Sequence, residues 1–93
     1  MLFSVLVETR LREGVADPQG STIERSLPAL GFDGVAGVRV GKAFRFTLEA
    51  ADEVGARAEV DDMCRRFLTN PVIEDATVTV EAATVGAATG TPA

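Results

Sequence analysis

The most regular stretch of the sequence is EVGARAEVDDMCRRFL, at residues 53–68. Its apolar side chains recur three or four positions apart, which is the spacing of one face of an α-helix. On the other face, acidic residues precede arginines by four positions, an arrangement that supports a solvent-exposed helix surface. The stretch therefore predicts an amphipathic helix packed on one side only. Its predicted inward residues are Ala56, Val60, Met63, Cys64, Phe67 and Leu68.

The sequence on both sides of this helix alternates between apolar and polar residues, which is the two-residue period of a β-strand. Before the helix the alternation covers residues 35–50, where Gly37 and Gly41 permit either one long bent strand or two strands. After the helix, Asn70-Pro71 ends the helical pattern and residues 76–82 alternate again. The inward residues are predicted to be Val38, Val40, Phe44, Phe46, Leu48, Ala76, Val78, Val80 and Ala82.

The N-terminal part predicts one more strand and one more helix. Residues 2–8 are apolar on both faces of a strand, so both faces need cover. The helix begins after Asp17 or, one turn later, after Ser21, because either side chain suits a cap. Pro28 should kink or shorten this helix, and Gly31 should stop it. The inward residues are Phe3, Val5 and Val7 on the strand and Ile23, Leu27 and Leu30 on the helix.

The predicted fold is a single small α+β domain over residues 1–82, with the order β-α-β-(β)-α-β. Two helices are expected on one face of one sheet. The first strand and the region of Phe44 and Phe46 carry more apolar surface than that face needs, so we expect dimerisation to extend or cover the sheet. Residues 83–93 hold only Ala, Thr, Gly, Pro and one Val, which predicts a low-complexity, disordered C-terminal tail.

The composition excludes most catalytic machinery for the isolated chain. A chain of 93 residues without histidine lacks the usual general base near neutral pH and the commonest zinc ligand. A net charge of −5 with scattered basic residues argues against nucleic acid as a partner. No apolar run reaches the roughly 20 residues that cross a membrane, so no membrane partner is expected. A single cysteine and an N-terminus without a leader pattern predict a cytoplasmic protein.

Few residues suggest chemistry of their own. Cys64 lies in the helical stripe with no histidine to activate it, so we interpret it as a core residue. The acidic pairs at 52–53 and 61–62 are interpreted as solvated ion pairs and not as metal ligands. The basic side chains at residues 38–42 either protect a sheet edge from pairing with other chains or take part in the protein's function. We predict no catalytic, cofactor-binding or metal-binding residue in this chain.

Six segments of the chain form a recognisable series when they are taken in order and spacing. They are Asp17-Pro18-Gln19-Gly20, Leu30-Gly31-Phe32-Asp33-Gly34-Val35, Val38-Arg39-Val40-Gly41-Lys42, Glu49-Ala50-Ala51-Asp52, Met63-Cys64 and Leu68-Thr69-Asn70-Pro71-Val72-Ile73-Glu74-Asp75. Together they resemble one family, PurS, the small subunit of phosphoribosylformylglycinamidine synthase. The resemblance covers residues 1 to about 82, whereas Pro28 and residues 83–93 depart from the family's pattern.

The resemblance implies a noncatalytic subunit of a ligase in purine biosynthesis, which makes formylglycinamidine ribonucleotide from formylglycinamide ribonucleotide, glutamine and ATP. In that family a PurQ-type glutaminase subunit releases ammonia and a PurL-type synthetase subunit uses ATP with Mg²⁺. PurS dimers join the two subunits and are needed for ammonia to pass between them. The implied partners are therefore these two subunits and further copies of this chain, as a homodimer or a higher oligomer. No cofactor is expected in this chain.

The resemblance carries over to few individual residues. Arg39, Gly41, Lys42, Asn70 and Pro71 match the family's motifs and are expected at partner interfaces or in the architecture. From the residues alone, another class stays open: a stand-alone dimeric regulatory module that binds a metabolite at its interface. An enzyme acting alone would need catalysis without histidine or a reactive cysteine.

Overall fold

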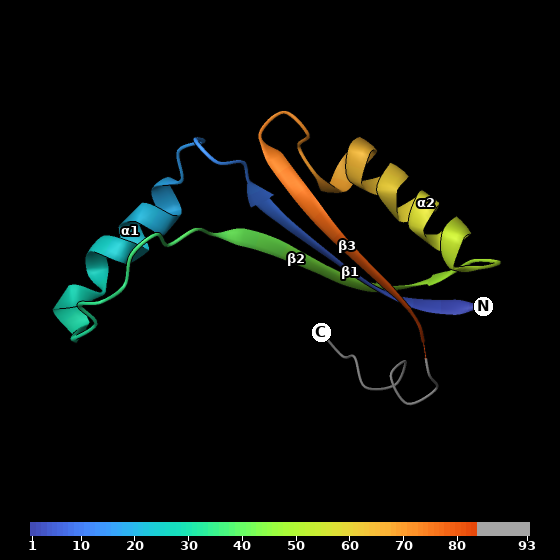
Figure 1. Cartoon of the computed structure of the whole chain (residues 1–93), viewed down its shortest axis with the longest axis horizontal. Coiled ribbons are helices and arrows are strands. Elements are labelled where there is room, and N and C mark those ends of the chain that lie inside the picture. The colour runs from blue at the N-terminus through green and yellow to red at the C-terminus, as the bar shows by residue number, and fades with distance from the viewer. Residues whose placement is uncertain (84–93) are drawn as a thin grey trace.

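The computed structural model describes residues 1–83, which form one antiparallel sheet with a helix against it and a second helix beyond its end (Figure 1). This confirms the α+β class. The tail that we expect to be disordered begins at residue 83, and the rest of it lies outside the described residues. The elements are β1 (Leu2–Leu11), α1 (Pro18–Ser26), the 3₁₀ turn η1 (Pro28–Leu30), β2 (Gly41–Glu49), α2 (Glu53–Met63), the π-helical turn η2 (Cys64–Leu68) and β3 (Glu74–Ala82).

The central strand is β1, which pairs with β2 on one side and β3 on the other. Val5 lies opposite Phe46 in β2 and Val80 in β3, so alternate residues of all three strands share the face that α2 covers. The alternation predicted for these strands is therefore confirmed. The buried hydrophobic core consists of Phe3, Val5, Val7, Ala56, Val60, Cys64 and Val80.

Helix α2 follows the predicted pattern until its last turn. Asp52 caps it by accepting a hydrogen bond from the Gly55 N–H at 2.7 Å. The chain then widens into η2, in which each turn takes more residues than in an α-helix. Leu68 consequently stays half-buried, while Phe67 turns away and is 88% exposed. The expectation that Phe67 faces inward is wrong for this reason.

Helix α2 covers the sheet only in part, because it lies along β3 and leaves β2 to one side (Figure 1). Phe44, Phe46 and Leu48 of β2 contact the core but remain half-buried. We call these three residues the open half-face. The opposite face of the sheet needs less cover than expected, since it is mainly polar. Beside the apolar Leu2 and Leu6, it carries Ser4, Glu8, Arg45, Thr47 and Thr79.

Residues 12–40, which we call the arm, extend from the end of the sheet, and the remaining described residues form the body (Figure 1). Gly20 is the only buried residue of the arm. The radius of gyration is 16.8 Å, against about 12 Å for a compact domain of this length. The prediction that both helices lie on one face of the sheet must therefore be corrected: α2 lies there and α1 does not.

Local chemistry explains why α1 stays off the sheet. The helix ends at Ser26, because Pro28 has no N–H for a helical hydrogen bond and Gly31 adopts a left-handed φ of 97°. Leu30 therefore falls outside α1, leaving too few apolar residues for a continuous stripe. Residues 35–50, expected to form either one long bent strand or two strands, form a single shorter strand, since β2 begins only at Gly41.

Among residues 1–83, no helix has the length and apolar character that crossing a membrane requires.

Candidate functional site

The five residues selected from the sequence gather at one end of the sheet, where β1 ends and β2 and β3 begin. Arg39 lies two residues before β2, Gly41 and Lys42 open it, and Asn70-Pro71 lie in the turn before β3. We call this region the junction. The strands bring together segments that are about 30 residues apart in the sequence because β1 is paired on both sides.

Lys42 reaches across the end of the core. It lies opposite the buried Thr9 in the ladder, so it shares the α2 side of the sheet. Its Nζ is 3.9 Å from Oε2 of Glu74, whose side chain is only 12% exposed. The other oxygen of Glu74 accepts a hydrogen bond from the Asn70 N–H at 2.7 Å. The pair thus links β2 to the turn before β3.

Gly41 and Asn70 fix the backbone at this end. A Cβ on Gly41 would lie 2.3 Å from the Thr9 carbonyl oxygen, so only glycine permits β2 to approach β1 here. The Asn70 side chain accepts a hydrogen bond from the Val72 N–H at 3.1 Å, which closes the turn around Pro71.

Arg12 belongs to the junction, although nothing in the sequence marks it. Its Nη2 donates to the Pro71 carbonyl at 2.6 Å, and its Nε lies 3.2 Å from Oδ1 of Asp75. Its backbone N–H donates to the Ile73 carbonyl at 2.8 Å. A single basic residue after a strand is too common in sequences to indicate such a role.

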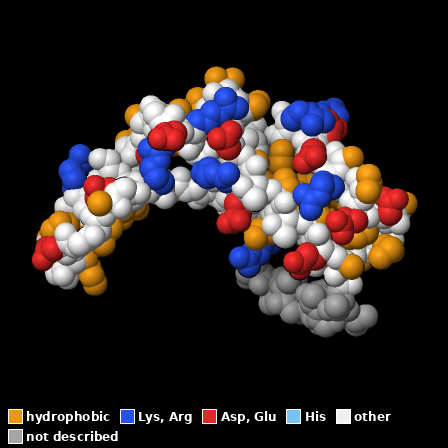
Figure 2. Space-filling model, viewed as in Figure 1, with side chains coloured by type: hydrophobic (Ala, Val, Ile, Leu, Met, Phe, Trp, Pro, Cys, Tyr) orange, Lys and Arg blue, Asp and Glu red, His pale blue; other side chains and the backbone are white. Residues whose placement is uncertain are grey.

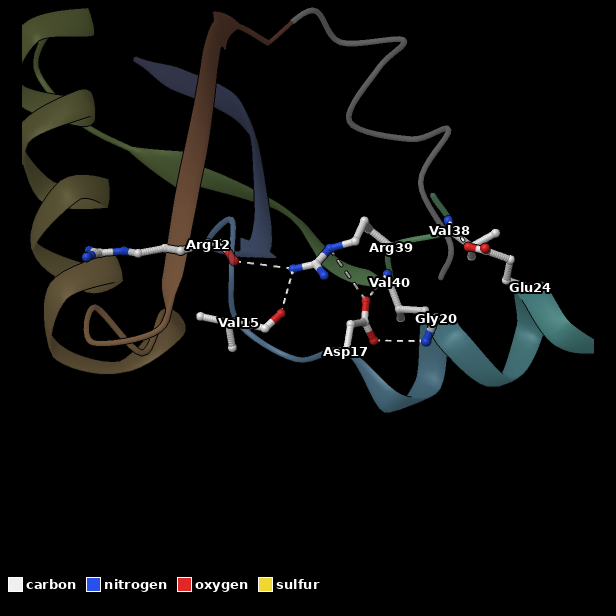
Figure 3. A network of polar contacts seen from close by, with 8 residues as sticks. All are labelled: Arg12, Val15, Asp17, Gly20, Glu24, Val38, Arg39 and Val40. Atoms are coloured by element: carbon white, nitrogen blue, oxygen red, sulfur yellow. Dashed lines mark hydrogen bonds and ion pairs between the residues drawn. The ribbon is translucent and has the colours of Figure 1, made fainter. Parts of the chain in front are cut away.

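Arg39 holds the base of the arm (Figure 3). Its Nη2 donates to the carbonyl oxygens of Arg12 and Val15, at 3.3 and 3.1 Å. Its Nε lies 4.0 Å from Oδ2 of Asp17. The Arg39 guanidinium group therefore joins the segment before β2 to the loop after β1 in this structure.

Asp17 is the other residue whose role the sequence did not reveal in full. Its cap on α1 decides between the two helix starts that the sequence left open, Asp17 and Ser21, since Oδ1 accepts from the Gly20 N–H at 2.9 Å. In addition, Oδ2 accepts from the Val40 N–H at 2.8 Å. The hydrogen bonds from Gly20 and Val40, with a smaller contribution from the Arg39 charge, hold the pKa of Asp17 below its ordinary value, so the group is ionised at neutral pH.

The junction connects chain segments and holds no catalytic arrangement among the described residues. A shallow depression of about 320 Å³ at the junction is lined by Glu8, Thr9, Arg10, Gly41 and Lys42. Within residues 1–83, no three cysteine, aspartate or glutamate side chains converge as a metal site requires. Cys64, the first residue of η2, is buried in the hydrophobic core.

A second feature is apolar and lies on the arm. Hydrophobic side chains gather along one side of the arm and at its tip (Figure 2). Burying such side chains is favourable by about 25 cal/mol per Å² of apolar surface, so an arm that exposes them favours association. We call these residues the arm stripe: Ile23, Leu30, Phe32 and Val35.

Comparison with known proteins identifies relatives over nearly the whole described chain. Residues 4–82 match the family model described as PurS, phosphoribosylformylglycinamidine (FGAM) synthase. The PurS subunit of FGAM synthase from Synechocystis is 48% identical over 65 residues, which span 70% of this chain and 65% of that protein. The PurS subunit from Methanocaldococcus jannaschii is 38% identical over 80 residues, 86% of this chain and 96% of that protein.

A solved structure has the same fold. It is the structure of PurLQS from Thermotoga maritima, in which one chain superposes with a TM-score of 0.81 at 33% identity. The superposition covers 87% of this chain and 99% of that chain. The arm is thus part of a fold shared with a protein that has been solved as a member of an assembly.

Proposed function

Because the chain belongs to the PurS family of FGAM synthase subunits, we propose that it is the noncatalytic connector that joins the glutaminase and synthetase subunits of this ligase. The observation that carries the proposal is the match to nearly the entire length of a chain from the Thermotoga PurLQS structure. Two uncovered apolar surfaces, the arm stripe and the open half-face, support a role in assembly.

The chemistry of the reaction is assigned to the other subunits. We propose that glutamine is hydrolysed in the PurQ-type subunit and that ATP and Mg²⁺ act in the PurL-type subunit. This chain contains no histidine, and its one cysteine is buried in the core. Its part is to hold the two active subunits so that ammonia passes between them. Such a role belongs in the cytoplasm and requires neither nucleic acid nor a membrane.

We propose that the junction residues Arg39, Gly41, Lys42, Asn70 and Pro71 serve this assembly by fixing the architecture at the base of the arm. Arg39 and Lys42 each contact a carboxylate of this chain, which supports a positioning role. Exchanging both cations for glutamate should leave a folded protein and weaken its assembly with the synthetase subunit. Unchanged co-purification and unchanged activity of the complex would contradict this assignment.

The activity of the reconstituted complex tests the connector function. Purified synthetase and glutaminase subunits are assayed with and without this chain, using glutamine or ammonium chloride as the nitrogen source. Because free ammonium bypasses transfer between subunits, we expect this chain to stimulate the glutamine-dependent reaction much more strongly than the ammonium-dependent one. Equal glutamine-dependent rates with and without the chain would refute the connector function.

A second measurement separates the connector from a regulatory module. We expect no increase in the melting temperature of the pure chain when amino acids or nucleotides are added. Stabilisation by one of these metabolites in the absence of partner subunits would favour the metabolite-binding module instead.

We further propose that a second copy of the chain covers both apolar surfaces. In a two-fold dimer, each arm stripe would pack on the open half-face of the other copy. Both apolar surfaces of both copies would then be buried. The two surfaces lie on different parts of the same chain, the arm and β2, which makes reciprocal contact possible.

Complementation between two variants tests this exchange. Leu30→Asp with Phe32→Asp disables the arm, and Phe46→Asp disables the half-face, so each variant alone should be monomeric in sedimentation. An equimolar mixture should recover dimers, because one intact arm then meets one intact half-face. Circular dichroism confirms that each variant is folded, and Phe44→Ser replaces Phe46→Asp if it is not. A dimeric arm variant, or a mixture that stays monomeric, would contradict the exchange.

A further inference from the structure

The carboxylate of Asp17 joins two segments that lie 23 residues apart in the sequence (Figure 3). One oxygen accepts from the Gly20 N–H at the start of α1, and the other accepts from the Val40 N–H one residue before β2. The side chain is only 6% exposed, although it lies in a connecting segment. The Asp17 side chain therefore ties the start of α1 to the residue from which the chain enters β2.

Residues 38–40 precede β2 and pair with no strand among the described residues, and two carboxylates supply acceptors for their backbone N–H groups. The Val38 N–H donates to Oε1 of Glu24 at 2.9 Å, and the Val40 N–H donates to Asp17. Two carboxylates of the arm thus replace the backbone carbonyls that a partner strand would offer.

The close approach of helix and segment depends on a glycine. A Cβ on Gly20 would lie 2.4 Å from the Val38 carbonyl oxygen and 2.8 Å from the Asp17 carboxylate. On the other side of the segment, Arg39 binds the carbonyl groups of Arg12 and Val15. Residues 38–40 consequently contact α1 on one side and the loop after β1 on the other.

We propose that Asp17 is a positioning residue for assembly. It holds the arm at the angle to the sheet at which the arm stripe meets the second copy of the chain. This proposal rests on the connector function proposed above. The arm has no buried apolar side chain, so polar contacts must set its orientation. An arm held in place before association loses less conformational freedom when the complex forms, and the complex is tighter as a result.

Asp17→Asn tests the hydrogen bond from the Val40 N–H separately from the cap on α1. An asparagine oxygen can still accept from Gly20 and cap α1, but the amide nitrogen cannot accept from Val40. Asp17→Ser is the second variant, since serine caps a helix and is too short to reach Val40. Asp61→Asn is the matched control, with the same chemical change at an exposed position on α2. The complete chain is used with both partner subunits.

Two readouts test the proposal. In the chain alone, Asp17→Asn should speed hydrogen exchange at the Val40 amide by about tenfold or more, as loss of a charge-assisted hydrogen bond predicts, while the Val5 and Val7 amides keep their protection. In the complex, the chain concentration for half-maximal glutamine-dependent activity should rise by about tenfold, with the same maximal activity at saturation. Asp61→Asn should change neither quantity.

The possible failures are distinguishable. Unchanged exchange at Val40 would overturn the proposal, since Asp17 would then not hold the segment. Faster exchange with an unchanged half-maximal concentration would also overturn it, because the arm's orientation would not matter for assembly. A lower maximal activity at saturation would assign Asp17 a different role. If the unsubstituted chain fails to stimulate the reaction at all, the connector function itself is refuted.

Discussion

The body and the arm show two different ways of holding a chain in place. In the body, β1 lies between two strands and under α2, and the hydrophobic core is formed by the sheet, α2 and η2. In the arm, Gly20 alone is buried, and the chain is held by Asp17, Glu24 and Arg39 through hydrogen bonds to backbone groups. Apolar burial stabilises the body whatever binds to it, whereas directional polar contacts fix where the arm points.

The largest expected difference concerns an aromatic side chain in each region. Phe3→Ala in the body should lower the free energy of unfolding by about 3–5 kcal/mol, because Phe3 is 2% exposed and its removal leaves a cavity. Phe32→Ala in the arm should change it by less than about 0.5 kcal/mol, because Phe32 is 57% exposed. Urea denaturation of the dilute chain measures both. Comparable losses would show that the arm is also held by apolar burial.

The next effect concerns the approach of α1 to residues 38–40. Gly20→Ala should force the helix away from Val38 and weaken the local structure by about 1–3 kcal/mol, as overpacking does. Hydrogen exchange should accelerate at Val38 and Val40 and stay slow in β1. Gly34→Ala is the control, since a Cβ there meets nothing within 4 Å. Faster exchange throughout the body would mean that arm and body unfold together.

A smaller effect distinguishes two neighbours in η2. Leu68→Ala should destabilise the body by about 1–2 kcal/mol, because this side chain is half-buried against the core. Phe67→Ala should have almost no effect on the isolated chain, because Phe67 is exposed. Thermal unfolding of both variants provides the measurement. A larger loss of stability from Phe67→Ala would indicate that α2 continues as a regular α-helix through residue 68 and not as a π-helical turn.

The smallest effect is expected at the junction. Lys42→Gln should lower the free energy of unfolding by less than about 1 kcal/mol, because an exposed lysine contributes little through an ion pair. The difference should shrink as salt is raised towards about 1 M, where charges are screened. Arg66→Gln, which removes a comparable pair with Asp62 on α2, is the control. A loss several times larger at Lys42 would make its contact with Glu74 part of the core.

Most of the body could be predicted from the sequence, because its elements depend on neighbours within a few positions. The alternation in β1, β2 and β3 and the spacing of Ala56, Val60 and Cys64 identified the buried faces. The shortening of α1 at Pro28 was also readable, and Asp17 was one of the two caps that the sequence offered, since each depends on a single turn of chain. Phe67 was misplaced because a π-helical turn changes the period without a clear sequence signal.

Only the tertiary structure decided where α1 lies and what the junction residues contact. The apolar spacing of Ile23, Leu27 and Leu30 suggested a helix on the sheet, but too little of it falls within α1 to bind there. The second hydrogen bond of Asp17 joins residues 23 positions apart, and the bond from Arg12 to Pro71 joins residues 59 apart. Local sequence patterns record which residues of one element face inward. They do not record which carbonyl or amide a polar side chain meets once the strands have brought distant segments together.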